Sequence, residues 1–205
     1  SGKTTTARKV AQSLGFVHIN TGAMYRGITL KFIREAVKLD DVLAIERILK
    51  NTQLDFVGPH LGILQMDGKD ISAEIISSLV TKNVSRFSAL SQVRVKLVEY
   101  QRQIAKDRNV VLEGRDIGTV VFPDADYKFY LIADIKVRAD RRKKEIEAAG
   151  EYIAMEAVIL FLKNRDQEDS SREHSPLMKA EDAIELDTTE LSIDDQVNYI
   201  INIVT

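Results

Sequence analysis

The chain contains no cysteine, no tryptophan, only three prolines and ten glycines among its 205 residues. The lack of cysteine excludes disulfide frameworks, thiolate zinc sites and thiol nucleophiles. So few prolines and glycines exclude a collagen-like or low-complexity chain, and a hydrophobic share of 44% is too high for a disordered one. We therefore expect one globular domain in a reducing compartment, with the cytoplasm as the default location.

Long apolar runs and an excess of charge of one sign are also missing. The longest apolar stretch covers residues 157–162, far short of the roughly 18 residues that span a membrane, and the N-terminus has no signal-peptide pattern. Net charge is −2, from 29 basic and 31 acidic residues, and only 6% of the residues are aromatic. We therefore expect neither a membrane nor a nucleic acid as a partner.

The periodicity of apolar residues predicts alternating helices and strands in the first half of the chain. The expected elements are a helix over 7–14 that ends at Gly15, a strand over 16–19, and helices over 24–33 and 42–49, the last capped by Asp40 or Asp41. Two short runs between residues 52 and 71, closed by turn signals at 58–59 and 67–68, predict a small antiparallel sheet.

The second half continues this alternation. We expect helices over 72–79, 91–106 and 137–148, strands over 109–113, 127–133 and 183–186, and a last helix that opens at Ser192. Residues 164–180 are charged and weakly periodic and include Pro176, which predicts a mobile segment. Helices that alternate with strands on both sides of the small sheet predict an α/β core with parallel strands.

Residues 1–4, SGKT, open the first helix. A phosphate-binding loop needs backbone N–H groups, a lysine for the phosphates and a hydroxyl for Mg²⁺ at a helix N-terminus. Gly2, Lys3 and Thr4 match the last three places of G-x-x-x-x-G-K-[ST], although an ordinary charged helix start would also look like this. Because the chain begins inside the motif, we expect the loop's first glycine and the central strand of the sheet to precede it.

Five arginines stand beside small or polar residues at the ends of predicted elements: Arg26, Arg94, Arg115, Arg165 and Arg172. Phosphoryl transfer depends on positive charge and fixed geometry around the transferred group. Each arginine alone is compatible with a solvated surface charge, so the functional interpretation depends on their joint placement. We expect the basic residues to gather around two phosphate-bearing substrates, with the balancing acids elsewhere.

Three further segments carry a family resemblance: NTGAMYR at 20–26, EGRDIGTVVFPDA at 113–125 and DTTELSI at 187–193. Together they resemble bacterial cytidylate kinases, and the resemblance extends over the whole chain. The block at 114–125 is long and unusual, and is therefore far more specific than SGKT.

This resemblance implies the P-loop nucleoside-monophosphate kinase fold. In this α/β fold, a core parallel sheet is flanked by helices and carries a small antiparallel NMP-binding insert and a short lid. Within one kinase domain over 1–205, the insert would cover about 51–85 and the lid about 164–178.

The implied reaction moves the γ-phosphoryl group of ATP to CMP or dCMP, which gives CDP or dCDP and ADP, with Mg²⁺ on the ATP phosphates. The resemblance assigns the ATP side to Gly2, Lys3, Thr4, Thr5 and Arg142, with Thr4 as a ligand of Mg²⁺. It implies catalytic roles for Lys3, Arg115, Arg165 and Arg172. The helix that carries Arg138, Arg141 and Arg142 would flank the adenine nucleotide, although a solvated basic face is an equal alternative.

The acceptor side is implied by the same resemblance. Its substrate-binding residues are Thr21, Tyr25, Arg26, Ser85, Arg94, Arg115, Asp116, Arg165 and Asp169. Arg26 and Arg115 would bind the CMP phosphate, Arg165 and Asp169 the ribose, and Arg172 the phosphates. Ser85, Arg94 and Asp116 would read cytosine, whose amino donor suits a carboxylate or hydroxyl and whose acceptors suit a guanidinium. Uracil inverts this donor pattern, so such a site should disfavour UMP.

The sequence departs from the family pattern at three places. Asn20 stands where the family often has an aspartate, and Glu168 and Ser170 stand where some relatives carry additional lid arginines. The acceptor-side loop therefore loses a charge, and the lid is less basic.

Two other functions remain open from the residues. A P-loop kinase for another small acceptor would keep Lys3 and Thr4 but would not explain why Ser85, Arg94 and Asp116 are combined. A non-catalytic nucleotide-binding or nucleic-acid-binding protein is the other alternative.

Some residues carry no functional expectation of their own. The three histidines, His18, His60 and His174, are too scattered for a metal site and are expected at the surface or in packing roles. Asp194 and Asp195 are expected to supply N-terminal helix charge. We expect a monomer, since small kinases close around their substrates by internal hinge motion.

Overall fold

The computed structural model describes residues 2–58, 62–148 and 150–205. Ser1, Pro59 and His60 lie outside these ranges, so the first residue of SGKT, half of the turn predicted at 58–59 and one of the three histidines are not described. None of the described helices has the length and apolar character that crossing a membrane requires.

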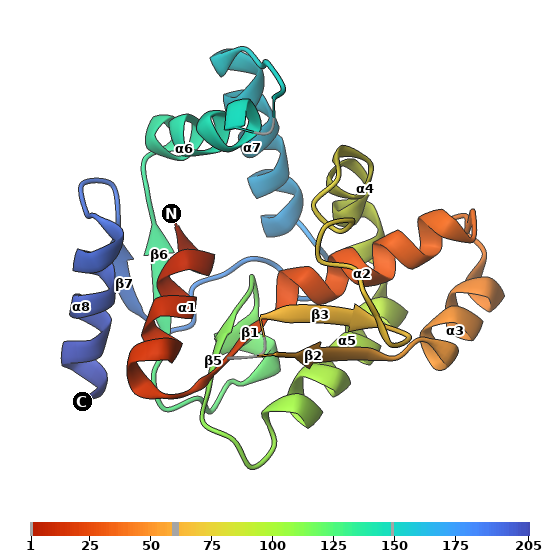
Figure 1. Cartoon of the computed structure of the whole chain (residues 1–205), viewed down its shortest axis with the longest axis horizontal. Helices are drawn as coiled ribbons and strands as arrows, with labels where there is room; N and C mark the ends of the chain where they lie inside the picture. Colours follow the sequence, from red (N-terminus) through yellow and green to blue (C-terminus); the bar gives the residue numbers. More distant parts are fainter. Residues whose placement is uncertain (1, 59–61, 149) are drawn as a thin grey trace.

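Helices and strands alternate along the chain (Figure 1). The helices are α1 (Lys3–Leu14), α2 (Thr21–Arg34), α3 (Val42–Asn51), α4 (Ser78–Ser88), α5 (Ser91–Ala105), α6 (Ile135–Ala148), α7 (Met155–Ser170) and α8 (Ile193–Val204). The strands are β1 (Val17–Asn20), β2 (Leu54–Val57), β3 (Ile63–Met66), β4 (Lys69–Asp70), β5 (Val110–Glu113), β6 (Phe129–Ile132) and β7 (Ile184–Asp187). A single π-helical turn over Ile117–Val121 follows β5. The predicted α/β class is confirmed.

The strands form two parallel pairs and one small antiparallel sheet. Strand β1 pairs with β5, with Asn20 opposite Glu113, and β6 pairs with β7, while β2, β3 and β4 are antiparallel. Both predicted strand arrangements are therefore present. The two parallel pairs do not join into one sheet in the described chain, and a cleft of about 1340 Å³ is lined by β5, β6 and one face of α1.

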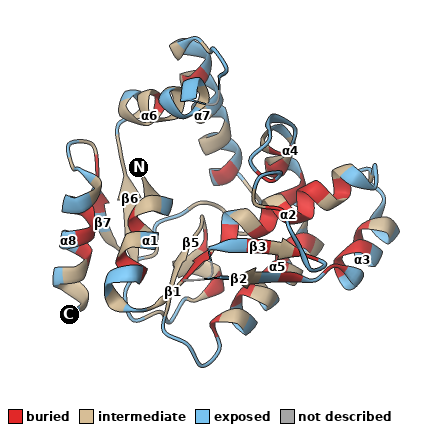
Figure 2. Cartoon of the chain, viewed as in Figure 1, coloured by how far each residue is buried: buried red, intermediate tan, exposed pale blue. Residues whose placement is uncertain are grey.

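Most of the buried apolar surface surrounds α2, which Figure 2 shows as the most continuously buried helix. Met24, Ile28 and Phe32 of α2 are buried among side chains from α3, α4, α5 and the antiparallel sheet. A smaller cluster joins α1, β7 and α8. The helix that follows the NTG motif is thus the rigid centre of one half of the molecule.

Three helix ends follow the predicted local signals. Gly15, with φ of 69°, ends α1, and the side chain of Asp41 accepts a hydrogen bond from Ala44 N at the start of α3. Ser192 and Asp195 form a reciprocal capping box at the start of α8. This gives Asp195 the helix-terminal role that was expected of it.

The helix predicted over 72–79 is wrong. Residues 72–77 form turns, and α4 starts only at Ser78, where the Ser77 hydroxyl accepts a hydrogen bond from Val80 N. The side chain of Asp70 accepts a hydrogen bond from Ser72 N and starts the turns. Local side-chain bonds here compete successfully with a helix that the apolar spacing favours.

The segment over 164–180, predicted to be mobile and to follow a helix, is itself helical in its first part, because α7 continues through Ser170. Some polar side chains of α7 point into the protein rather than into water. Asp169 is buried, and Asp166 pairs with Arg138 of α6. A helix whose inner face binds charged groups has no apolar stripe, which is why its periodicity looked weak.

Helices α6 and α7 lie side by side beyond the end of β6, and α7 ends close to α4 (Figure 1). Arg138 donates two hydrogen bonds to the carboxylate of Asp166, over 2.6 and 2.9 Å, and so fixes the two helices to each other. This hairpin brings the end of α7 over the carboxyl ends of the β1 and β5 strands.

Replacement of Phe32 by alanine should destabilise the fold strongly. Phe32 is fully buried and its ring centre lies 4.9 Å from that of Phe87, so the substitution leaves a cavity in the larger core. We expect a loss of about 3–5 kcal/mol in the free energy of unfolding, measured by urea denaturation. Leu43→Ala, at a position that is 79% exposed on α3, is the control, and an equal loss in both variants would contradict the assignment of the core.

Candidate functional site

The start of α1 forms one end of the site. Gly2 precedes α1 with φ of 70°, and a Cβ there would lie 2.8 Å from Cδ1 of Ile193, so the position requires glycine. Lys3 and Thr4 begin the helix, followed by the half-buried Thr5. The Thr4 hydroxyl donates a 2.7 Å hydrogen bond to the carboxylate of Glu113 at the end of β5.

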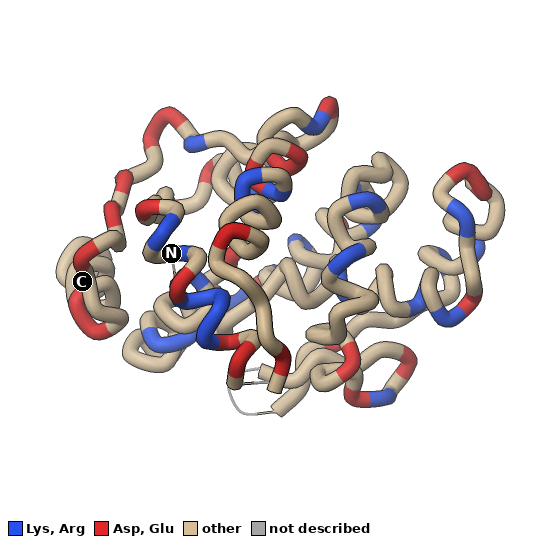
Figure 3. Tube along the Cα trace, turned by 90° about the horizontal axis from the view of Figure 1, so that it is seen from above, with Lys and Arg blue, Asp and Glu red and all other residues tan. Residues whose placement is uncertain are grey.

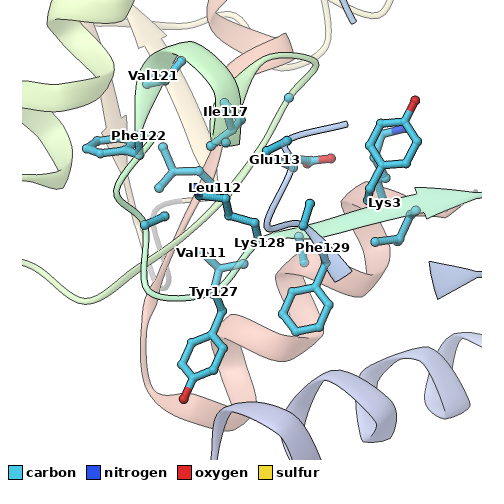
Figure 4. A pocket seen from close by; sticks show the side chains of 18 of the residues that line it. Lys3, Val111, Leu112, Glu113, Ile117, Val121, Phe122, Tyr127, Lys128 and Phe129 are labelled. Carbon is cyan, nitrogen blue, oxygen red and sulfur yellow. The ribbon is translucent and has the colours of Figure 1, made fainter. Parts of the chain in front are cut away.

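Lys3 lies at one end of the cleft (Figure 4), where the charges of Arg115 and Arg138 act on it. Burial of its ammonium group, with the neighbouring charges of Arg115 and Arg138, lowers the pKa of Lys3 from 10.5 to about 8. Glu113 and Asp166 oppose this shift only in part. A bound anion would restore the ordinary pKa, so the site favours a negatively charged ligand beside Lys3.

Glu113 is a candidate functional residue that sequence reasoning did not single out. One carboxylate oxygen accepts the hydrogen bond of Thr4, and the other lies 3.2 Å from Nε2 of His18. The available signal was its position, because an acid at the carboxyl end of a buried parallel strand faces the crevice where α/β proteins bind ligands.

Thr21 and Asn20 have local structural contacts. The Thr21 hydroxyl donates to the backbone oxygen of Glu113 over 2.7 Å, and Asn20 caps α2 by accepting from Ala23 N over 3.0 Å. A Cβ on Gly114 would lie 2.6 Å from Thr21 Oγ1, so only glycine lets these two turns approach. Asparagine and aspartate cap helices about equally well, so Asn20 keeps this function.

Arg94 and Asp116 form a buried ion pair, with both side chains 5% exposed. Arg94 also donates to the backbone oxygen of Ser88 over 3.1 Å, and its guanidinium lies 5.2 Å from the centre of the Tyr25 ring. Burial raises the pKa of Tyr25 to about 12, which keeps its hydroxyl protonated. The structure thus brings together three of the predicted acceptor-side residues.

Ser85 is placed differently from the expectation. It is half-buried on α4, and its backbone oxygen accepts a hydrogen bond from the Ser88 hydroxyl. The contacts to Arg94 and Arg172 come from Ser88, one turn further along α4. Ser88 is therefore a second residue at the site that sequence reasoning did not identify.

Three predicted arginines meet at Asp169, which is 2% exposed. Arg115 donates to its carboxylate over 2.7 Å, Arg172 forms a hydrogen bond with it, and Nε of Arg165 lies 4.0 Å away. Burial and the neighbouring guanidinium of Arg115 lower the pKa of Arg165 to about 10. Three positive charges around one carboxylate leave an excess of two, which matches the charge of a phosphate dianion.

Arg26 lies near this cluster but is engaged elsewhere. It donates to the backbone oxygen of Ile75 over 3.2 Å and to the Thr81 hydroxyl over 2.9 Å, which joins α2 to the turns that precede α4. Its pKa is lowered by burial and by the charges of Arg142 and Arg115. The structure therefore does not bring Arg26 into contact with Asp169.

The arginines of α6 have separate partners. Arg142 pairs with Glu145 on the same helix over 2.8 Å, and Arg141 donates to the backbone oxygen of Thr188. Arg138, which pairs with Asp166, is the one whose charge lowers the pKa of Lys3. The charge beside Lys3 thus comes from Arg138, whereas Arg142 is the arginine of this helix that the resemblance assigned to the ATP side.

The expectation that acids lie away from the basic cluster is wrong. Asp116, Asp166 and Asp169 each pair with arginines in it, and Figure 3 shows acidic and basic residues interspersed along the chain. The physical reason is desolvation, because buried guanidinium groups need counter-charges when no anion is bound.

The donor set at Thr4 fits a hard cation. The described residues contain no group of three His, Cys, Asp or Glu side chains that could hold a metal ion by themselves. A hydroxyl and a carboxylate 2.7 Å apart supply two oxygen ligands, which suits Mg²⁺, a cation that keeps waters and takes phosphate oxygens for its remaining positions.

Comparison with known proteins agrees with this arrangement. The family model described as cytidylate kinase matches residues 1–205. The chain belongs to the cytidylate kinase family. Among the similar proteins, the cytidylate kinase of Fusobacterium nucleatum is 44% identical, over 98% of this chain and 90% of that protein. Those of Caldanaerobacter subterraneus and Chloroherpeton thalassium are 43% and 42% identical, over 98% and 100% of this chain and 88% and 89% of their own lengths.

Membership of the cytidylate kinase family confirms the predicted activity. The chain is a nucleotide-binding kinase that phosphorylates CMP or dCMP with ATP. A kinase for an unrelated acceptor and a non-catalytic binding protein, the two alternatives that the residues left open, are thereby set aside.

The affinity of the chain for ATP should fall as the pH rises above neutrality. With a pKa of about 8, about nine tenths of Lys3 is charged at pH 7 and about one tenth at pH 9. We expect the dissociation constant of ATP, measured by calorimetry, to rise about tenfold over this range. The Lys3→Arg variant keeps its positive charge over this range, so its dissociation constant for ATP should not change with pH. An equal dependence on pH in both proteins would contradict the role of Lys3.

Proposed function

We propose that the start of α1 holds the ATP phosphates. Gly2, Lys3, Thr4 and Thr5 lie at the N-terminus of this helix, where backbone N–H groups and the helix dipole favour an anion. The lowered pKa of Lys3 supports this proposal, because it reports a concentration of positive charge that a phosphate would neutralise. Arg138 takes part at this end, and Arg142, which pairs with Glu145, acts further out along α6.

Thr4 and Glu113 would hold Mg²⁺ at this end of the site. Bound there, the ion would neutralise charge on the ATP phosphates. Thr4 supplies a hydroxyl oxygen, and the carboxylate of Glu113, which accepts its hydrogen bond, supplies a negative charge beside it.

The base of the acceptor nucleotide would bind beside the Arg94–Asp116 pair. A buried carboxylate and guanidinium, held in register by their mutual ion pair, supply the acceptor and donors that the amino and ring atoms of cytosine require. Tyr25 packs on Arg94 and limits its rotation. Ser85 or Ser88 of α4 would supply the hydroxyl, and Thr21 shapes the floor through its bond to Glu113.

The three arginines around Asp169 would bind the phosphates and ribose of the acceptor and the transferred group. Their excess of two positive charges is the single observation that supports phosphoryl transfer most directly. Arg115, Arg165 and Arg172 would move from the carboxylate to the phosphate oxygens when substrate binds. Arg26, tied to Ile75 and Thr81, would follow when the neighbouring turns close.

Two segments would close over the substrates. Residues 51–85, which contain the antiparallel sheet, would form the NMP-binding insert, and residues 164–178, from the end of α7 onward, would form the lid. The lid carries Arg165, Asp169 and Arg172, so its closure would bring positive charge to the γ-phosphoryl group and exclude water that would otherwise hydrolyse ATP.

A monomer in the cytoplasm completes the proposal, since small kinases of this architecture close around their substrates by internal hinge motion. Light scattering at micromolar concentration should give the mass of a single chain, about 23 kDa. A stable dimer would contradict the proposed state.

Asp116→Asn should weaken discrimination between CMP and UMP. The substitution keeps the size of the side chain but removes the charge that pairs with Arg94 and replaces an acceptor oxygen by a donor, which suits uracil better than cytosine. We expect kcat/KM for CMP to fall about 100-fold while that for UMP falls less, in a coupled assay with ATP.

Asp40→Asn, at an exposed carboxylate before α3 and outside both closing segments, is the matched control and should change neither value. An unchanged preference for CMP in Asp116→Asn would contradict the proposed base site, whereas absence of activity toward any nucleotide in a chain that also carries the expected start of the phosphate loop would contradict the proposed reaction.

A further inference from the structure

His18 is a buried polar residue that the proposed mechanism does not use. It lies on β1, where its side chain is 6% exposed, and the side chain of Glu113 is 9% exposed. In the register of the β1–β5 pair, His18 is opposite Val111, two residues before Glu113. Because side chains alternate between the faces of a strand, His18 and Glu113 are diagonal neighbours on one face of the pair.

Two side chains contact the carboxylate of Glu113, one at each of its oxygens. Nε2 of His18 lies 3.2 Å from Oε1 of Glu113, and the Thr4 hydroxyl donates to Oε2 over 2.7 Å. The carboxylate of an ionised glutamate only accepts hydrogen bonds, so a hydrogen bond in this contact requires the tautomer of His18 that carries its proton on Nε2. Each oxygen of the carboxylate therefore has its own donor, one from β1 and one from α1.

We propose that His18 is a positioning residue for the ATP and Mg²⁺ end of the site. By holding Oε1, it fixes the carboxylate of Glu113 so that Oε2 faces Thr4. His18 reaches no substrate itself and acts through Glu113. This inference rests on the roles proposed above for Thr4 and Glu113, and it goes beyond the packing role that the sequence alone assigns to His18.

The carboxylate of Glu113 has other cations within its surroundings, which is why a hydrogen-bond donor at position 18 matters. Lys3 and Arg115 lie near Glu113, and the charge of Glu113 raises the pKa of Lys3. Without the imidazole, Oε1 would remain buried without a donor, and the carboxylate would turn toward these cations. Glu113 would then compete with the ATP phosphates for Lys3 and would leave Thr4.

The first test compares His18→Leu, which removes the donor, with His18→Gln, which keeps a side-chain N–H. Substitutions of residues that orient a metal ligand typically cost 10–100-fold in metal affinity or activity. We expect His18→Leu to weaken binding of the Mn²⁺ complex of ATP, measured by calorimetry, at least tenfold, with the KM for CMP unchanged. His18→Gln should recover most of this affinity.

Thr6→Val is the matched control. Thr6 lies on α1, as Thr4 does, and its hydroxyl donates a buried 2.8 Å hydrogen bond to Gln196 rather than to Glu113. It should bind the Mn²⁺ complex of ATP normally. Equal losses in His18→Leu and Thr6→Val, or in His18→Leu and His18→Gln, would overturn the proposal, as would an equal rise in the KM for CMP.

The second test does not depend on catalysis or on ATP binding. In the full chain labelled with ¹⁵N-histidine, nuclear magnetic resonance should show His18 protonated at Nε2, with a signal that shifts in Glu113→Gln and stays in place in Thr6→Val. An Nδ1-protonated tautomer, or no response to Glu113→Gln, would overturn the proposal. If a chain that also carries the expected start of the phosphate loop failed to bind the Mn²⁺ complex of ATP, the proposed function would fail, and this measurement would still decide the contact.

Discussion

The pairing of buried carboxylates with guanidinium groups is the constraint on which the site depends. Burial alone penalises a charged side chain, and it lowers the pKa values of Lys3 and Arg165 even with the acids in place. Asp116 and Asp169 offset part of this cost for Arg94, Arg115 and Arg172. The pairs also hold together elements that are distant in sequence, since Asp169 ends α7 while Arg115 follows β5.

The same pairing links binding with closure. In the proposed binding mode, a phosphate that enters the cluster would replace Asp169 as the partner of its arginines, and the carboxylate would be released as the guanidinium groups change partner. The energetic change is small, because one charge-assisted contact is exchanged for another. A site arranged in this way can therefore discharge its product without breaking a strong, unmatched interaction.

The sequence predicted the elements with strong local signals. Gly15, Asp41 and Ser192 marked helix ends correctly, because caps act within one turn of the chain. The family was identified from the block at 114–125, and the convergence of Arg115, Arg165 and Arg172 was expected from it. The helix over 72–79 failed because short side-chain bonds decided the local structure, and α7 was cut short because its inner face binds charges.

Contacts between distant residues explain what the sequence could not supply. Glu113 and His18 are ordinary residues of two strands until the register of the β1–β5 pair places them side by side. Ser88 and Ser85 are one turn apart on α4, and only the position of Arg172 shows which of them contacts it. Arg138 and Arg142 are likewise one turn apart on α6, and only their partners distinguish them, because Arg138 pairs with Asp166 and Arg142 with Glu145.

The cleft between β5 and β6 bears on how the parallel strands could form one sheet. In the described chain, each of these strands pairs on one side only, with β1 or with β7, so the backbone groups on the sides that face the cleft remain available for hydrogen bonding. Open parallel edges with apolar walls accept any extended apolar segment that reaches them. One extended strand seated in this cleft would pair with both edges and would join the two parallel pairs into one continuous sheet.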